Sequence, residues 1–363
     1  MEHKGVSYPE ALKIIARKYN IEVQENEMTR EDVRRNNDRE SMFALNSWAA
    51  EYFAEHLRQS EEGMAYFSQQ RGFMDATIKK FGLGMCPAQW DKMTQDAITA
   101  SYCKEFLLST GLTAKSSKNG KMFDRFRERV MFPMHNISGR IVAFAGRTLR
   151  VANGVGKYVN SPASQIFNKS NELYGLFFAK RAIQQQDFAI LVEGYADVIS
   201  MHQAGIENVV ASLGTALTKG QIQLLGRFTK NITVIYDGDS PGILAALRSV
   251  DLILKEGMNV RILLLPEGED PDSFVRTHSA SEVQAYIAEN QENFITFKAK
   301  VLMQDAANDP IRCSEVITDI VQSIALISDN IQRAVYADTC ARIMGIDKGL
   351  IISEVNRIHG SHQ

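Results

Sequence analysis

The sequence contains no run of about 18 apolar residues, and its start, MEHKGVSYPEALKII, has no apolar stretch. A membrane-spanning helix needs such a run, and a signal peptide needs an apolar segment behind a basic start. These two absences argue against a membrane partner and against secretion. We therefore expect a cytoplasmic protein.

Cysteine is scarce. The four cysteines, Cys86, Cys103, Cys313 and Cys340, are scattered, form no C-x-x-C pair and have no histidine at metal-ligand spacing. Zinc sites need clustered ligands. We expect no zinc in this chain and interpret the cysteines as reduced thiols in a cytosolic protein.

Several familiar motifs are also missing. The chain has no G-x-x-x-x-G-K-[ST] loop, no G-x-S-x-G turn, no internal repeat and no low-complexity tract. A P-loop ATPase and a hydrolase with a nucleophile elbow are therefore not indicated. With 45% hydrophobic and 23% charged residues, the 363-residue chain has the composition of a globular protein of two or three domains.

Charge is unevenly distributed, although the formal total is only −2. Residues 115 to 181 hold 13 Lys and Arg against three Asp and Glu, a net charge of +10, which leaves −12 for the rest of the chain. A field this segregated favours an anionic polymer as partner, although a solvated basic face is the simpler alternative. In the segment RFRER, an extended backbone would aim Arg125, Arg127 and Arg129 at one face, where they could follow phosphates.

The chain divides into four expected regions. Ser7-x-x-Glu10 with Pro9 predicts a capping-box helix in a linker, residues 1–27. Residues 28–186 form a basic, mixed α+β subdomain. The polar residues 20–40, which span the linker boundary, look weakly structured, and residues 41 to about 114 look mostly helical. Residues 187–280 form an α/β domain, and residues 281–363 look entirely helical.

The α/β prediction rests on four apolar, β-rich runs separated by helical stretches, at residues 188–192, 208–212, 232–236 and 260–265. Such alternation is typical of a parallel, doubly wound sheet. The helix signals agree with it. Thr218-x-x-Gln221 is a capping box, Ser240-Pro241 supplies an N-cap and N1 proline, and Gly205 and Gly257 are placed as helix stops.

Acidic residues follow three of these runs. Glu193 comes directly after the first, Asp237 and Asp239 after the third, and Asp270 and Asp272 shortly after the fourth, with Asp197 on the helix behind Glu193. Ligands of open α/β sheets bind at the carboxyl ends of the strands, and clustered carboxylates call for divalent cations such as Mg²⁺. We therefore predict a two-metal phosphoryl-transfer site. Each acid taken alone could equally be a helix cap or a loop carboxylate.

At these residues the sequence resembles a known domain. LVEGYADV, VASLGTALT, VIYDGDSPGILAA and LPEGEDPDSFV are similar to the TOPRIM domain of bacterial primases, topoisomerases and some nucleases. RFRERVMFPMHNISGRIVAFAGR and KYVNSPASQIFNKSNELYG resemble the bacterial DnaG-type primases in particular. The fold implied is a TOPRIM-type parallel sheet flanked by the basic subdomain and the helical subdomain.

The resemblance implies a DNA-directed RNA polymerase core that makes short RNA primers on single-stranded DNA during replication, using ribonucleoside triphosphates and two or more Mg²⁺ or Mn²⁺ ions. Glu193, Asp237 and Asp239 would be the catalytic, metal-binding acids, completed by Asp197, Asp270 and Asp272. The DNA and nucleotide groove would be lined by residues of the basic segment: Arg140, Arg147, Lys157, Asn160 and Lys169. The charge pattern of RFRER adds Arg125 and Arg127 as candidates for DNA or nucleotide binding. Lys157 and Lys169 could instead be solubilising surface residues.

The chain departs from the family pattern at its ends. Family members usually begin with a zinc-binding module and end with a domain that docks on the replicative helicase, and neither is expected here. The helix at residues 7–19 resembles the tail of the zinc module. We therefore expect the catalytic core of a longer bacterial protein, whose helicase partner binds elsewhere.

Two alternatives stay open. A TOPRIM topoisomerase or nuclease would share the fold, but the 11 tyrosines show no setting typical of a breakage nucleophile. A non-catalytic DNA-binding scaffold would bind DNA without responding to metal or nucleotides, and the intact acids argue against it.

Overall fold

The computed structural model describes residues 29–150, 156–214, 216–236, 240–266, 268–303 and 309–361. The chain separates into two compact units, Met1–Ser41 and Met42–Gln363. The predicted linker and its capping-box helix lie outside the described residues. None of the helices in the described ranges is long and apolar enough to cross a membrane.

Helix α2 (Arg30–Gln59) begins earlier than the sequence suggested. Thr29 and Asp32 form reciprocal bonds at its start, from the Thr29 amide to Asp32 Oδ2 at 3.2 Å and from the Asp32 amide to Thr29 Oγ1 at 3.1 Å. Such a pair satisfies donors that an uncapped helix leaves open. The prediction of weak structure for residues 20–40 is therefore wrong for residues 30–40, where this cap starts a helix of polar residues.

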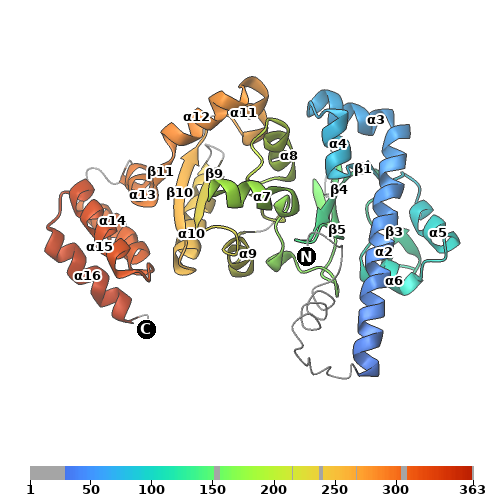
Figure 1. The fold of residues 1–363 in the computed structure, drawn as a ribbon, viewed down its shortest axis with the longest axis horizontal. Helices are drawn as coiled ribbons and strands as arrows, with labels where there is room; N and C mark the ends of the chain where they lie inside the picture. Colours follow the sequence, from blue (N-terminus) through green and yellow to red (C-terminus); the bar gives the residue numbers. More distant parts are fainter. Residues whose placement is uncertain are drawn as a thin grey trace, which may run out of the picture. The chain divides into compact units, whose positions relative to one another are not determined.

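The N-terminal part of the second unit surrounds a four-stranded antiparallel sheet with strand order β1-β4-β5-β6 (Figure 1). Its strands are β1 (Gly84–Met85), β4 (Arg129–His135), β5 (Ile141–Thr148) and β6 (Tyr158–Asn160), and β2 (Thr113–Lys115) pairs separately with β3 (Met122–Asp124). The helices here are α3 (Glu61–Ala65), the π-helix η1 (Tyr66–Gln70), α4 (Asp75–Phe81), α5 (Lys92–Thr99), α6 (Lys104–Ser109), the 3₁₀ turn η2 (Lys169–Asn171) and α7 (Leu176–Gln186). A mixed α+β arrangement is thus confirmed.

The predicted parallel sheet is also confirmed. Strands β7 (Ala189–Val192), β8 (Val209–Ala211), β9 (Asn231–Tyr236) and β10 (Asn259–Leu264) pair in parallel in the order β10-β9-β7-β8. Each matches one apolar run within about two residues, which is the usual scatter of strand boundaries. The connecting helices are α8 (Tyr195–Gln203), α9 (Lys219–Leu225), α10 (Ser240–Lys255) and α11 (Pro271–Thr277).

The helix signals mostly hold. Thr218 and Gln221 form the predicted capping box of α9, and Gly205 and Gly257 take positive φ angles of 87° and 70° after α8 and α10. Only a residue without Cβ adopts that conformation without strain, which explains why these helices stop there. The start of α10 differs by one residue, because Ser240 is its first residue instead of its N-cap.

The C-terminal part consists of α12 (Ala280–Asn290), α13 (Phe294–Met303), α14 (Pro310–Ala325), α15 (Asn330–Met344) and α16 (Lys348–Ser361). The prediction of an entirely helical segment is wrong at one point. Glu292–Asn293 form a short strand, β11, which pairs antiparallel with the outer side of β10. The two residues follow the end of α12 beside an open strand edge, where ladder bonds satisfy their backbone groups.

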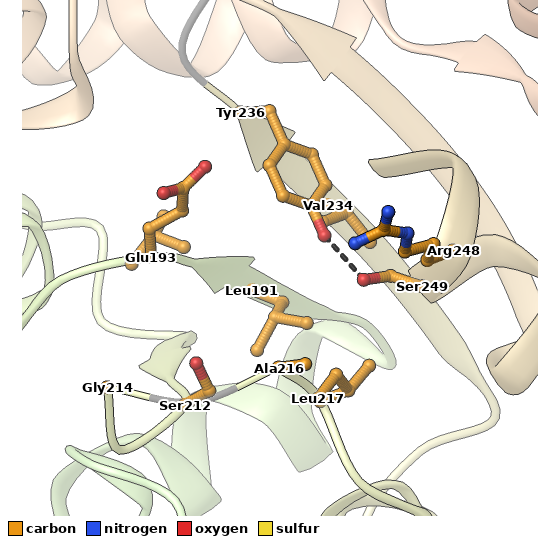
Figure 2. Close-up of a pocket in the computed structure, with 11 residues that line it drawn as sticks. Leu191, Glu193, Ser212, Gly214, Ala216, Leu217, Val234, Tyr236, Arg248 and Ser249 are labelled. Carbon is orange, nitrogen blue, oxygen red and sulfur yellow. Dashed lines mark hydrogen bonds between the residues drawn. The ribbon is translucent and has the colours of Figure 1, made fainter. Parts of the chain in front are cut away.

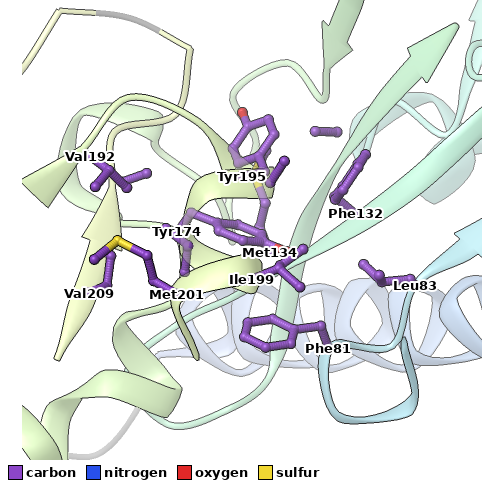
Figure 3. Packing of buried hydrophobic residues seen from close by; sticks show 14 of the residues in the cluster. Phe81, Leu83, Phe132, Met134, Tyr174, Val192, Tyr195, Ile199, Met201 and Val209 are labelled. Carbon is purple, nitrogen blue, oxygen red and sulfur yellow. The ribbon is translucent and has the colours of Figure 1, made fainter. Parts of the chain in front are cut away.

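The core runs across the predicted boundary at residue 186. One buried cluster contains residues from α4 and β4 together with residues from β7, β8 and α8. Figure 3 shows part of it, with Phe81 and Phe132 close to Tyr174, Tyr195 and Ile199. Burying each such side chain contributes about 1.5–3 kcal/mol. The antiparallel and parallel sheets are therefore held together by a shared apolar core.

Candidate functional site

The carboxyl ends of β7, β8 and β9 open onto a pocket of about 430 Å³. Figure 2 shows Glu193, which follows β7, and Tyr236, at the end of β9, side by side at this edge. The lining is apolar toward the sheet and polar toward the rim: Leu191, Val192, Glu193, Ser212, Gly214, Ala216, Leu217, Val234, Tyr236, Arg248 and Ser249. A pocket therefore lies at the carboxyl edge of the parallel sheet, the edge where open α/β sheets usually bind ligands.

Glu193 is exposed to solvent at this edge. Its charge acts on Tyr236, whose hydroxyl donates to Ser249 Oγ at 2.6 Å. Burial, with a smaller contribution from Glu193, raises the pKa of Tyr236 to about 12, although the bond to Ser249 opposes this shift. Tyr236 is therefore neutral near pH 7, and Glu193 is the one carboxylate among the described residues that line the pocket.

Asp197 lies in the first turn of α8 and closes its cap. Its Oδ2 accepts a hydrogen bond from the amide of Gly194 at 2.9 Å. A carboxylate in the first turn of a helix is also stabilised by the positive end of the helix dipole. Asp197, which is half-buried, thus stabilises the turn that follows Glu193.

Asp237 and Asp239 lie outside the described residues. The last residue described in β9 is Tyr236, and the placement of these two aspartates behind the strand stays a prediction. Within the described ranges, no group of three or more His, Cys, Asp or Glu side chains is placed to hold a metal ion. The predicted set needs the two aspartates to be complete.

Asp270 is the N-cap of α11. Its Oδ1 accepts a hydrogen bond from the amide of Ser273 at 2.7 Å, and its own amide donates to Ser273 Oγ at 3.0 Å. Its φ and ψ of −109° and 167° are extended, as the following Pro271 predicts. One carboxylate oxygen is engaged in the cap, which leaves the other as a candidate metal ligand.

Asp272 lies deeper, with only 3% of its surface exposed. Its Oδ2 forms an ion pair with Arg71 Nη1, and its Oδ1 accepts a hydrogen bond from Ser200 Oγ. Buried carboxylates are stable only when paired and hydrogen-bonded in this way. Both oxygens of Asp272 therefore bind groups of the protein itself.

The basic residues of the site come from β5, β6 and the adjacent loops. Arg147 in β5 is half-buried and donates through Nη1 to the hydroxyl of Tyr66. Arg140 is exposed, and its guanidinium lies 3.6 Å from the centre of the Phe43 ring. Lys157 and Lys169 are also exposed. Of these four cations, Arg147 is thus the one that the protein partly buries, whereas the other three are exposed.

Asn160 connects the two sheets. Its Nδ2 donates to the carbonyl of Leu213 at 2.9 Å, and its Oδ1 accepts from the hydroxyl of Tyr195 at 3.2 Å. Leu213 lies in the loop after β8, next to the pocket residues Ser212 and Gly214. Asn160 therefore positions this loop beside the pocket.

The predicted row of arginines in RFRER is wrong. Residues 125–128 form a turn, in which Glu128 has a positive φ of 54°, so the three side chains do not share one face. Arg125 Nε donates to the carbonyl of Gly111 at 2.8 Å, and the Arg127 guanidinium lies 4.1 Å from the centre of the Trp90 ring. Both arginines are half-buried in local contacts, and their proposed contact with DNA remains a prediction.

Arg129 shows why the row fails. It is 6% exposed, and its guanidinium donates to the carbonyls of Gly146, Lys157 and Gly156 at 3.1 to 3.2 Å. It therefore holds β4 to β5 and to the loop before β6. Sequence reasoning also missed Arg71 and Tyr66, since nothing in their local pattern points to a partner on α11, 201 residues away from Arg71.

Comparisons with known proteins agree with this geometry. Residues 52–180 match the family model for the N-terminal domain of the DNA primase catalytic core, and residues 190–275 match a Toprim-like model. A parallel sheet with acids behind its strands, joined to a basic antiparallel subdomain, thus places the chain among the TOPRIM-containing proteins. The chain belongs to the DnaG-type DNA primases, as the resemblance of its motifs implied.

Individual relatives cover most of this chain. The DNA primase of Halalkalibacterium halodurans is 33% identical over 360 residues, which are 98% of this chain and 59% of that protein. A DNA primase domain from Pseudomonas aeruginosa superimposes with a TM-score of 0.77 at 32% identity, covering 88% of this chain and 99% of that one. A DnaG primase catalytic domain bound to single-stranded DNA has a TM-score of 0.74 at 30% identity, covering 85% and 99%. The chain spans about three fifths of the length of the curated relatives it matches.

Proposed function

We propose that this chain synthesises short RNA primers on single-stranded DNA by nucleotidyl transfer from ribonucleoside triphosphates. The observation that carries the proposal is the position of Glu193, exposed at the carboxyl edge of the parallel sheet in a chain of the primase family. The related catalytic domain bound to single-stranded DNA supports the choice of template. A replicative helicase is proposed as partner of the whole bacterial protein, in the cytoplasm at the replication fork.

The donor set suits divalent ions. Glu193, Asp237 and Asp239 would hold Mg²⁺ or Mn²⁺, with Asp197 and Asp270 beside them, because hard cations prefer carboxylate oxygens together with substrate phosphates. When bound, such ions neutralise phosphate charge and activate the attacking hydroxyl. Glu193 fits this role on its own geometry, since its carboxylate is exposed at the rim of the pocket.

The protein's own residues orient the reactants. Asn160 holds the loop after β8 against the pocket, and Asp197 closes the turn after Glu193. Arg147, Lys157 and Lys169 supply positive charge for phosphates of template and nucleotide. Hydrogen bonds that are formed before the reaction reduce the cost of organising charged groups in the transition state.

The test is a primer-synthesis assay with the full chain, a single-stranded template, ribonucleoside triphosphates and Mn²⁺. We expect an oligoribonucleotide product, and we expect Glu193→Gln to lower its rate by about 10²–10³-fold, the usual effect of losing one charged group that stabilises the transition state. Since Glu193 is exposed, thermal unfolding should hardly change.

Glu51→Gln is the matched control, because Glu51 is an exposed glutamate on α2, far along the chain from the sheet. It should keep full activity. An active Glu193→Gln variant would remove this residue from the mechanism. Metal-dependent nicking of supercoiled plasmid without nucleotides would instead favour a nuclease or topoisomerase, and salt-dependent DNA binding without any turnover would favour a scaffold.

A further inference from the structure

The π-helix η1 (Tyr66–Gln70) has an unusual backbone pattern. The amide of Arg71 donates to the carbonyl of Tyr66 at 3.0 Å, five residues back along the chain. The side chains repeat this pairing, since Arg71 Nε donates to the Tyr66 hydroxyl at 3.0 Å. π-turns are rare and often occur at functional sites.

Tyr66 holds a second guanidinium. Its hydroxyl also accepts from Arg147 Nη1, and the guanidinium carbons of Arg147 and Arg71 lie 4.8 and 5.7 Å from the centre of its ring. Tyr66 is only 2% exposed. The two guanidinium groups that bind this buried hydroxyl are both positive, so they repel each other unless a negative charge lies nearby.

Asp272 supplies that charge. Its carboxylate pairs with Arg71 and accepts a bond from Ser200, so it joins the π-turn to α11, where Asp272 lies, and to α8, where Ser200 lies. The pKa of Arg71 shows the balance: burial alone would lower it, but Tyr66 and Asp272 outweigh burial and raise it. The polar network is therefore Arg147, Tyr66, Arg71, Asp272 and Ser200.

Backbone contacts strengthen the same junction. Arg276 on α11 donates through Nη1 to the carbonyl of Gln70 at 2.9 Å. Gln203 on α8 donates to the carbonyl of Gly72 at 2.9 Å and accepts from the amide of Met74 at 2.8 Å. The segment after the π-turn is thus bound to both helices.

We propose that Tyr66 and Arg71 are positioning residues that fix α8 and α11 relative to Arg147 of the basic strand β5. The first turn of α8 contains Asp197, and the N-cap of α11 is Asp270. Asp272 serves as the anchor of this arrangement, since both its oxygens bind the protein. This proposal rests on the proposed function, because the network would hold the candidate metal-binding acids at fixed positions relative to a cation that binds phosphate. A displacement of about 1 Å is enough to cost an enzyme about 10²-fold in rate.

The first test is Tyr66→Phe, which removes the shared hydroxyl and keeps the buried ring. We expect the rate of primer synthesis to fall by about tenfold or more, and the Mg²⁺ concentration for half-maximal rate to rise, at a temperature well below the unfolding midpoint. Affinity for a labelled single-stranded oligonucleotide, measured by fluorescence anisotropy without metal, should change by less than about twofold, because the exposed cations Lys157 and Lys169 remain.

Tyr174→Phe is the matched control. Tyr174 is another buried tyrosine of the same core, and its hydroxyl has no hydrogen-bond partner among the described residues. Its removal should leave rate and Mg²⁺ dependence unchanged. If Tyr66→Phe behaves like Tyr174→Phe while the unmodified chain makes primers and Glu193→Gln does not, the positioning role is wrong and the proposed function stands. An inactive unmodified chain would defeat both.

The second test needs no turnover. Arg71→Met, Asp272→Asn and the double variant are compared by urea unfolding, since breaking one side of a buried pair destabilises more than replacing both sides. We expect the double variant to be more stable than the sum of the single losses predicts, by at least about tenfold in the unfolding equilibrium constant. The exposed pair Lys80–Glu207, 2.7 Å apart, should show almost no coupling in Lys80→Met and Glu207→Gln.

A different pattern would overturn the anchor role of Asp272. If Asp272→Asn raises the half-maximal Mg²⁺ concentration while Arg71→Met does not, and the unfolding free energies simply add, Asp272 acts as a metal ligand independent of Arg71. Equal shifts in both single variants, together with coupling in stability, are the result that the network predicts.

Discussion

The acidic edge of the parallel sheet and the basic antiparallel subdomain place their charges in opposite ways. Glu193 follows directly from the end of a buried strand and is exposed, so its position follows from the chain's own strand pattern. In the basic subdomain, Arg129 is buried among backbone carbonyls, whereas Lys157 is exposed. A net charge counted along a sequence therefore overstates the charge that a partner can contact, because some cationic side chains are buried and bind groups of the protein itself.

The largest effect that would sharpen this comparison is on stability. Arg129→Met should lower the free energy of unfolding by about 3 kcal/mol, because it leaves carbonyls of Gly146 and Gly156 without their charged donor. Lys157→Met should change it by less than about 0.5 kcal/mol. Urea unfolding followed by circular dichroism measures both. Similar losses in the two variants would break the distinction between structural and accessible cations.

Low pH should destabilise both regions, so acid sensitivity does not distinguish them. Burial lowers the pKa of His202 on α8 from 6.5 to about 4, and burial also lowers the pKa of His135 on β4 to about 4. Because the folded pKa is depressed, the stabilisation is present above pH 6.5 and is lost as the pH falls toward 4. For His202 alone, the free energy of unfolding should fall by about 2 kcal/mol between pH 7.5 and 5.

His202→Gln tests this share, since an amide can still donate to the carbonyl of Val209, which His202 Nε2 contacts at 3.2 Å. Urea unfolding of this variant at the two pH values should show a smaller difference than the unmodified chain shows. An unchanged difference would assign the acid sensitivity to other groups.

The smallest expected effect concerns DNA binding. Lys157→Ala and Lys169→Ala should each weaken single-stranded DNA binding severalfold and reduce the slope of log affinity against log salt by about 0.7. Lys255→Ala, which removes an exposed lysine at the end of α10, is the matched control and should leave the slope unchanged. Fluorescence anisotropy at several salt concentrations gives the slopes. Equal slopes in all three variants would assign Lys157 and Lys169 to a solvated surface.

The parallel sheet was predictable from the sequence, because apolar runs and capping boxes are local patterns. The position of Glu193 was predictable in the same way, since parallel strands bring their carboxyl ends to one edge. The turn at residues 125–128 was not predictable from the alternating spacing of the arginines. Glu128 has a positive φ, and its backbone amide donates a hydrogen bond to the carbonyl of Pro87, which is distant in the sequence. The pair of Arg71 and Asp272 was hidden for the same reason, since its partners are distant in the chain and meet only after folding.

The short strand β11 has a consequence for the molecule as a solute. Sheet edges with unpaired backbone groups invite pairing with other chains and lead to aggregation. Here Glu292–Asn293 cover β10, and Tyr174 exchanges two backbone bonds with Ala211 on β8, at 2.9 and 3.1 Å. Each outer strand of the parallel sheet is thus paired over part of its length, at Arg261 and Ile262 of β10 and at Ala211 of β8. These short segments leave fewer backbone groups available for pairing with a second copy of the chain.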